Sequence, residues 1–156
     1  MPFAIVDKQH ARIHVFEAGG RLLASSAVLL GADRGDHSVP GVGQRAQTGE
    51  VARGERTTPA GRFLTQPGRN LQGEHVVWVD YASAFAIHRL RPGPALRQRQ
   101  AQLVSATPDD NRASLGCVVV PVAFYASVVQ PVLGQRRAVV YVLPESGQIG
   151  EAAFAL

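Results

Sequence analysis

The single cysteine of the chain, Cys117, stands in a sequence context that suits a nucleophile. It follows Ser114-Leu115-Gly116, where an irregular loop is predicted to enter a strand. A glycine directly before a thiol lets backbone N–H groups approach a substrate carbonyl, which is the arrangement that an oxyanion hole requires. A lone cysteine is also commonly a small buried apolar side chain. The context alone therefore leaves two interpretations open, a catalytic thiol and a core cysteine.

A histidine that could act as general base for such a thiol lies at the end of a predicted strand. His88 belongs to the apolar run Phe85–Leu90, which an irregular segment follows. An imidazole at a strand end can take the proton of a thiol that another segment supplies. The alternative is a structural histidine that bonds a backbone carbonyl. Four other histidines stand in polar or ordinary contexts: His10, His14, His37 and His75.

The elements that must position these two residues are mainly strands. Short runs with alternating or continuous apolar residues predict strands at 3–6, 12–17, 22–30, 62–65, 74–81, 85–90, 118–120 and 138–143. Short helices are expected over Ala95–Ser105 and from Pro121 to about Val129. Two long irregular segments, Gly31–Thr58 and Arg91–Arg112, are expected to flank a binding cleft. The pattern predicts an all-β core with one or two attached helices.

Composition limits the remaining possibilities. The 156 residues, 46% of them apolar and 18% charged, are expected to form one domain spanning residues 1–156, not a disordered chain. Lys8 is the only lysine, and the arginines that supply the rest of the +4 charge are scattered, so we expect no nucleic-acid partner. No Cys/His cluster has zinc-ligand spacing, and no glycine-rich phosphate motif is present, so we expect no metal or nucleotide.

The termini and apolar runs show no membrane or export signal. The longest apolar stretch, Cys117–Leu133, is interrupted by two prolines and a glutamine and is shorter than the roughly 20 residues that a membrane span needs. The first residues lack the charged and apolar regions of a secretory signal. We therefore expect no membrane span, and either a protein that does not use that export route or a mature form.

Four segments, in the same order, resemble the catalytic domain of the YkuD-type L,D-transpeptidases, which remodel bacterial peptidoglycan. The opening from Ile5 to Gly31 resembles the first hairpin of the family and its closing glycine. The segment Thr58-Pro59-Ala60-Gly61-Arg62-Phe63 is similar to the TPxGxF turn of the family, and Ile87-His88 resembles the strand that ends in the catalytic histidine. Ser114-Leu115-Gly116-Cys117 resembles the nucleophile motif, which is usually Ser-His-Gly-Cys.

The resemblance implies a mainly β fold, a mixed β-sandwich with a helix beside the nucleophile, and a thioester mechanism without metal or other cofactor. Cys117 would attack an amide carbonyl of a peptidoglycan stem peptide, and His88 would take the thiol proton. The Arg89 carbonyl would orient the imidazole. Backbone N–H groups of the Ser114–Cys117 motif, those of Leu115, Gly116 and Cys117, would hold the oxyanion.

The resemblance also implies partners and a location. Stem-peptide carboxylates are expected to bind arginines of the two irregular segments: Arg45, Arg53, Arg91 and Arg112. Carbapenem-type inhibitors are expected to acylate Cys117, and the protein is expected to be a monomer of the periplasm or cell envelope.

The chain departs from the family pattern at two positions beside the thiol. Leu115 replaces the usual histidine, and Val119 replaces the usual arginine or asparagine. Family members with both changes include peptidoglycan amidases. Transpeptidation is therefore the first expectation, with a peptidoglycan amidase or L,D-carboxypeptidase as the alternative. A non-catalytic cell-wall-binding domain and an interaction module with a core Cys117 stay open as well.

Overall fold

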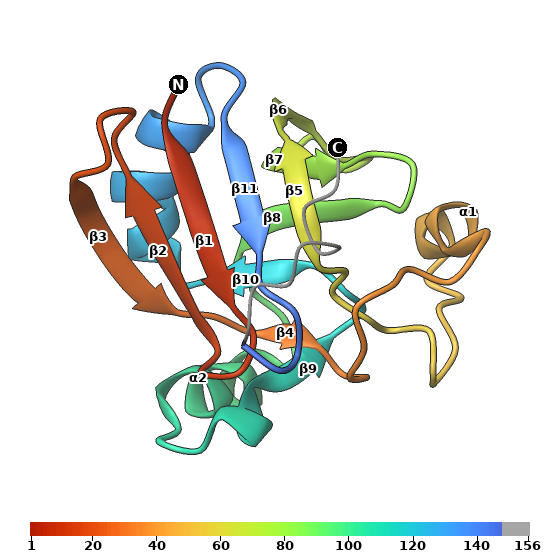
Figure 1. Ribbon diagram of the computed structural model, residues 1–156. Helices are drawn as coiled ribbons and strands as arrows, with labels where there is room; N and C mark the ends of the chain where they lie inside the picture. The colour runs from red at the N-terminus through yellow and green to blue at the C-terminus, as the bar shows by residue number, and fades with distance from the viewer. Residues whose placement is uncertain (148–156) are drawn as a thin grey trace.

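Alternating apolar side chains along the first two strands define the buried face of the larger sheet. The computed structural model describes residues 1–147, and this sheet has five strands in the order β3-β2-β1-β11-β5 (Figure 1). Its strands are β1 (Phe3–Asp7), β2 (Arg12–Phe16), β3 (Leu22–Ala27), β5 (Gly61–Leu64) and β11 (Val139–Val142). The β1, β2 and β3 strands form the predicted antiparallel meander, and β11 lies parallel to β1.

The second sheet has four strands, in the order β10-β8-β7-β6. They are β6 (Gln66–Arg69), β7 (His75–Asp80), β8 (Phe85–Arg89) and β10 (Val118–Val120). The β6, β7 and β8 strands are antiparallel, whereas β10 runs parallel to β8. Parallel neighbours require a crossover connection. This crossover carries α2 (Leu96–Val104), a 3-10 turn (Pro108–Asn111) and β9 (Arg112–Ser114).

The main core lies between the two sheets. Val118 and Val120 of β10 and Ile87 of β8 point into it, together with the buried residues of β1 and β2. The helix after β10 begins as α3 (Val122–Phe124) and continues as a π-helix over Tyr125–Leu133, whose buried face joins the same core. The mainly β fold with mixed sheets and a few helices that the sequence predicts is confirmed.

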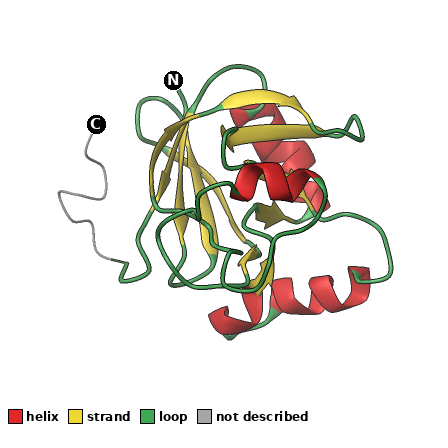
Figure 2. Ribbon diagram, turned by 90° about the vertical axis from the view of Figure 1, so that its right-hand side faces the viewer, coloured by secondary structure: helices red, strands yellow, loops and turns green. Residues whose placement is uncertain are grey.

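The outer face of β8 and β10 is covered as well. A second apolar cluster joins Leu29, Leu90, Leu103 of α2 and Val119 on this face. A two-stranded parallel sheet of β4 (Leu30–Gly31) and β9 lies beside it, and Figure 2 shows α2 at this end of the molecule. The β8 strand is therefore buried on both faces, which explains its continuous apolar sequence.

Two elements differ from the sequence-based expectations. The β6 strand was not predicted because it contains Pro67 and Gly68, but it is an edge strand, where both residue types are tolerated. Gly68 is required there, since a Cβ would lie 2.8 Å from the indole of Trp78. The helix after Pro121 runs to Leu133 because the i→i+5 pattern of its π-helical part accommodates Pro131.

The long segment after β4 is anchored by the only lysine of the chain. Lys8, at the end of β1, is buried, and its Nζ donates to the carbonyl oxygens of Gly35 (2.6 Å) and Thr58 (2.7 Å) and to a carboxylate oxygen of Asp36 (2.9 Å). The segment also contains the short helix α1 (Val42–Gln47). No helix within residues 1–147 has both the length and the apolar character to cross a membrane.

Candidate active site

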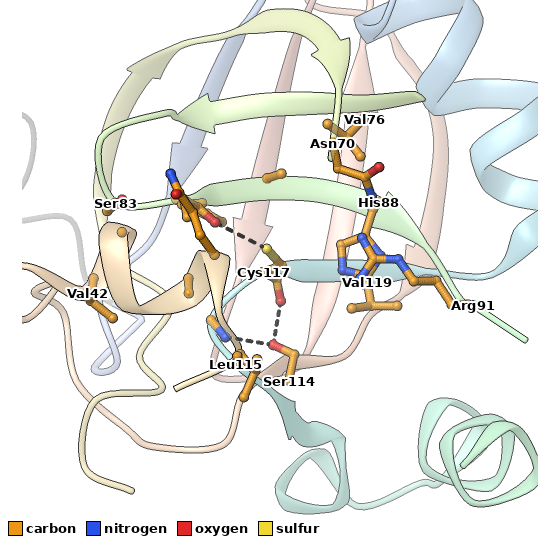
Figure 3. A pocket seen from close by; sticks show the side chains of 18 of the residues that line it. Val42, Asn70, Val76, Ser83, His88, Arg91, Ser114, Leu115, Cys117 and Val119 are labelled. Atoms are coloured by element: carbon orange, nitrogen blue, oxygen red, sulfur yellow. Dashed lines mark hydrogen bonds between the residues drawn. The ribbon is translucent and has the colours of Figure 1, made fainter. Parts of the chain in front are cut away.

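The pairing of β8 with β10 places Cys117 and His88 on one face of the second sheet. His88 lies opposite Val119, and Cys117, two residues earlier, therefore lies opposite Ala86. Because side chains alternate along a strand, all four share the outer face. The spacings of a parallel pair put the Cα atoms of Cys117 and His88 about 8 Å apart on the diagonal. Figure 3 shows both side chains in the same pocket.

The orientation of the His88 ring is set by its own backbone. Nδ1 donates a hydrogen bond to the Arg89 carbonyl oxygen at 2.8 Å, the contact that the family resemblance implies. A carbonyl only accepts, so Nδ1 carries the proton and Nε2 keeps its lone pair. Burial, followed by the nearby charge of Arg91, lowers the pKa of His88 to about 4. The imidazole is therefore neutral near pH 7 and is chemically a base.

The Cys117 thiol is also held in its neutral form. Its Sγ donates to the Ala84 carbonyl oxygen at 3.6 Å, and Ala84 has the left-handed backbone (φ 56°) that is uncommon outside glycine. Burial raises the pKa of the thiol, while a hydrogen bond from the Ala86 backbone acts against this effect. Within residues 1–147 no hydrogen bond joins Sγ to His88. The predicted dyad is therefore a neutral thiol beside a neutral imidazole, and direct contact between them stays a prediction.

The loop before Cys117 is closed by Ser114. Its hydroxyl donates to the Cys117 carbonyl oxygen at 2.6 Å and accepts the Gly116 N–H at 3.1 Å. The Gly116 N–H, which was expected to help hold an oxyanion, is bonded to Ser114 in this conformation, and its role in holding an oxyanion stays a prediction. Within the described residues, the N–H groups of Leu115 and Cys117 donate no hydrogen bond and remain the candidate oxyanion donors.

Thr58 of the TPxGxF-like turn anchors the Ser114–Cys117 loop through its side-chain hydroxyl. Its fully buried hydroxyl donates to the Gly116 carbonyl oxygen at 2.7 Å and accepts the Gly31 N–H at 2.9 Å. Gly116 has φ 134°, and a Cβ there would lie 3.0 Å from the Thr57 carbonyl oxygen. The turn therefore fixes the nucleophile loop to β4, and it explains why glycine precedes the cysteine.

The pocket over these residues has a volume of about 780 Å³. Both long irregular segments line it as expected, one through α1 and Thr57, the other through the stretch from Arg91 to Arg99. Leu115, which is 45% exposed, and the aromatic pair Trp78 and Tyr81 form other parts of the wall. No group of three or more His, Cys, Asp or Glu residues between 1 and 147 is placed to hold a metal ion.

Only one of the four arginines that the sequence suggested for carboxylate binding lines the pocket, namely Arg91. Arg112 forms a bidentate ion pair with Glu145 (2.8 and 2.7 Å) beside Lys8, and Arg45 pairs with Glu55. Arg53 is exposed but lies outside the pocket lining. A protein carboxylate already occupies Arg112 and Arg45, so these placements do not support a substrate role for them.

The Glu145 carboxylate shows how strongly Arg112 is engaged. Burial alone acts to raise its pKa, but the hydrogen bonds from Arg112 and the Gly35 N–H and the charge of Lys8 bring the pKa down to about 2. Glu145 is therefore ionised throughout the physiological range. It holds Arg112 in the fold rather than leaving it available to a ligand.

Sequence reasoning missed two pocket arginines, Arg69 and Arg99. Arg69 lies at the end of the unpredicted strand β6, and Arg99 lies on α2 among other polar residues. Neither position carries a motif. Only the crossover path between β8 and β10 brings α2 to the pocket, so no local signal could have found Arg99.

The comparisons with known proteins give a fold but no family. No family model matches the chain, and no curated protein matches it. Among solved structures, the chain is similar to the helical cell shape determining protein Pgp2 from Campylobacter jejuni, with 14% identity and a TM-score of 0.54 over 92% of this chain and 47% of that chain. An L,D-transpeptidase from Mycobacterium smegmatis matches with 16% identity and a TM-score of 0.47, over 90% of this chain and 58% of that chain.

The likeness to Pgp2 shows that the two-sheet arrangement is shared with a known protein. The chain spans about half the length of both solved structures. At 14% identity the comparison establishes the fold alone, so the chemistry of the pocket has to be argued from its own residues.

Replacing Thr58 should affect both stability and the thiol. Thr58→Val should lower the free energy of unfolding by about 2–4 kcal/mol, because the buried Gly31 N–H and Gly116 carbonyl lose their partner. It should also speed alkylation of Cys117 several-fold, because the loosened loop exposes the sulfur. Urea unfolding and the alkylation rate at fixed pH measure the two effects.

Thr65→Val is the matched control, since the Thr65 hydroxyl is equally buried and bonds both backbone groups of Ala138 far from the pocket. It should cost stability without changing alkylation, and Thr58→Ser should restore both properties. Equal alkylation rates in Thr58→Val and Thr65→Val would contradict the anchoring role of Thr58.

The pH dependence of Cys117 alkylation should reflect its raised pKa. The rate with iodoacetamide should rise about tenfold per pH unit through neutrality and beyond pH 8, because only the thiolate reacts. A rate that levels off below pH 8 would show that the pKa of the Cys117 thiol is low. It would contradict the neutral thiol and neutral imidazole described above. Slow alkylation near pH 7 is therefore expected for a catalytic Cys117 as well as for a packing one.

Proposed function

We propose that this protein is a cysteine acyltransferase, an L,D-transpeptidase that acts on peptidoglycan stem peptides through a thioester on Cys117. The observation that carries the proposal is the β8–β10 register, which puts the only thiol of the chain and the free Nε2 of His88 diagonally on one pocket wall. The ordered likeness of four segments to the YkuD-type family supports it. Residues 1–156 are proposed to form one catalytic domain of that family.

Acylation begins with the neutral pair. As Sγ of Cys117 attacks the amide carbonyl, its proton moves to Nε2 of His88, and the carbonyl oxygen becomes an oxyanion near the N–H groups of Leu115 and Cys117. The C–N bond then breaks, and His88 returns the proton to the leaving amine. The Arg89 carbonyl stabilises the transient imidazolium through Nδ1–H.

Deacylation reverses these steps with a second nucleophile. An amine or a water molecule gives its proton to Nε2 of His88 and attacks the thioester, the S–C bond breaks, and the thiolate of Cys117 recovers the proton. An amine forms a new amide, which is transpeptidation, and water releases a free acid, which is hydrolysis. No metal or organic cofactor is required by either route.

One observation favours hydrolysis as the second candidate. The walls beside the thiol are apolar where the family usually has polar residues, with Leu115 partly exposed to the pocket and Val119 buried next to His88. An amine acceptor needs more positioning than water does. A peptidoglycan amidase or L,D-carboxypeptidase reaction by the same dyad is therefore the alternative function.

The proposed setting follows from the substrate. Peptidoglycan lies in the cell envelope, and we propose that the protein works there as a monomer and that carbapenem-type inhibitors acylate Cys117. The fold neighbour Pgp2 is described as a cell shape determining protein, which is compatible with this setting.

Incubation with muropeptides and an added D-amino acid tests the reaction type. We expect new cross-links or exchanged terminal residues, measured by chromatography and mass spectrometry, because the thioester partitions to amines. Cys117→Ala should abolish turnover and leave the free energy of unfolding unchanged, since a small side chain replaces a small one. His88→Asn should strongly reduce turnover.

Two other outcomes of the muropeptide incubation would change the assigned reaction. Shortened or released stem peptides without any exchange would establish the hydrolase. No change in any muropeptide would contradict both enzymatic functions and leave the non-catalytic binding domain.

A further inference from the structure

Among residues 1–147, two of the three pocket arginines, Arg69 and Arg99, have no acidic partner, and of these two only Arg99 is half-buried. Arg69, Arg91 and Arg99 line the pocket, and Arg91 pairs with Glu74 at 2.7 Å. Arg99 is half-buried, and its Nη1 donates to the Ala113 carbonyl oxygen at 2.6 Å. Between residues 1 and 147 it has no acidic partner. A tethered guanidinium with unused donors at an open pocket is suited to a carboxylate from outside.

Arg99 lies at the histidine end of the pocket. Its anchor, Ala113, packs on the outer-face apolar cluster that contains Leu90 and Val119. Along this face of β8 the order is Ala86 opposite the thiol, then His88, then Leu90. His88 therefore lies between Cys117 and the Arg99 end of the pocket.

This order gives Arg99 a position relative to the reacting bonds. The imidazole that removes the thiol proton must deliver it to the leaving amine, so that amine lies on the His88 side of the scissile carbonyl. A carboxylate one carbon beyond the amine extends farther along the same direction, toward Arg99. By microscopic reversibility, an attacking amine occupies the same position.

We propose that Arg99 is a specificity-determining residue that binds a carboxylate on the leaving amine, and equally on the acceptor amine, beside His88. The inference rests on the proposed function and deepens it. It assigns to Arg99 the recognition of the carboxylate that neighbours the reacting amine. In acylation the S–C bond forms and the C–N bond breaks, and in transfer to an acceptor amine the C–N bond forms and the S–C bond breaks. His88 carries the single proton in both half-reactions.

The electrostatics of the site support a link between binding and catalysis. After burial, the charges of Arg91 and Arg99 are among the influences that lower the pKa of His88. A carboxylate bound to Arg99 offsets this positive field and makes the imidazole a stronger base. Substrates with the carboxylate are thus favoured in the proton-transfer step as well as in binding.

The direct test compares two stem peptides, one ending in a free carboxylate and one in a carboxamide. Arg99→Gln should lower kcat/KM for the carboxylate peptide about 10–100-fold, the usual loss for a charged hydrogen bond, and leave the carboxamide peptide unchanged. Arg97→Gln is the matched control, because Arg97 lies on α2 but is exposed and outside the pocket lining. It should change neither rate.

A binding measurement separates this inference from the proposed function. In a Cys117→Ala protein, excess D-alanine should raise the pKa of His88 measured by NMR, and D-alaninamide should not. Arg99→Gln should remove the D-alanine effect, and Arg97→Gln should retain it. This NMR result, together with no turnover by the wild-type protein, would refute the proposed function and still support the carboxylate site.

Two results would overturn the Arg99 proposal. One is an equal loss, or no loss, for both peptides in an active Arg99→Gln enzyme. The other is an NMR response to D-alanine that is absent, or that persists unchanged in Arg99→Gln. Neither result bears on the proposed reaction of Cys117 and His88, which the muropeptide experiment tests separately.

Discussion

A buried chain of polar contacts from Lys8 to Gly116 is the constraint on which the site depends. Lys8 binds the Thr58 carbonyl, and the Thr58 hydroxyl binds both the Gly31 N–H and the Gly116 carbonyl. Each of these groups would be costly if it were buried alone. The end of the first sheet, the long irregular segment and the nucleophile loop are therefore stable only together, and this holds Cys117 at the edge of the second sheet.

The second constraint is electrostatic. The pocket is apolar enough to keep the thiol of Cys117 and the imidazole of His88 neutral, with the pKa of one raised and that of the other lowered to about 4. Arg99, which has no acidic partner within residues 1–147, is the group at which we propose that an anionic substrate changes this field. Under that proposal, selectivity and activation arise from the same contact.

Sequence patterns predicted the elements with clear local periodicity. They also pointed to Cys117 and His88, which stand within motifs. The alternation in β1, β2 and β7 and the apolar run of β8 depend only on burial of neighbouring residues, so they are visible in the sequence. The β6 strand was hidden by Pro67 and Gly68, which only an edge position tolerates. The substrate arginines were misplaced because Arg112 is held by Glu145, more than thirty residues away. Arg99 reaches the pocket only through the crossover, which no local pattern reveals.

The central claim is that Cys117 forms a thioester with the help of His88. Intact-protein mass spectrometry after incubation with a carbapenem tests it most directly, because the drug supplies a strained acyl donor that does not depend on the peptide acceptor. We expect one covalent adduct, mapped to Cys117, absent in Cys117→Ala and formed much more slowly in His88→Asn. An unmodified wild-type protein, or an adduct that forms at the same rate without His88, would contradict the account.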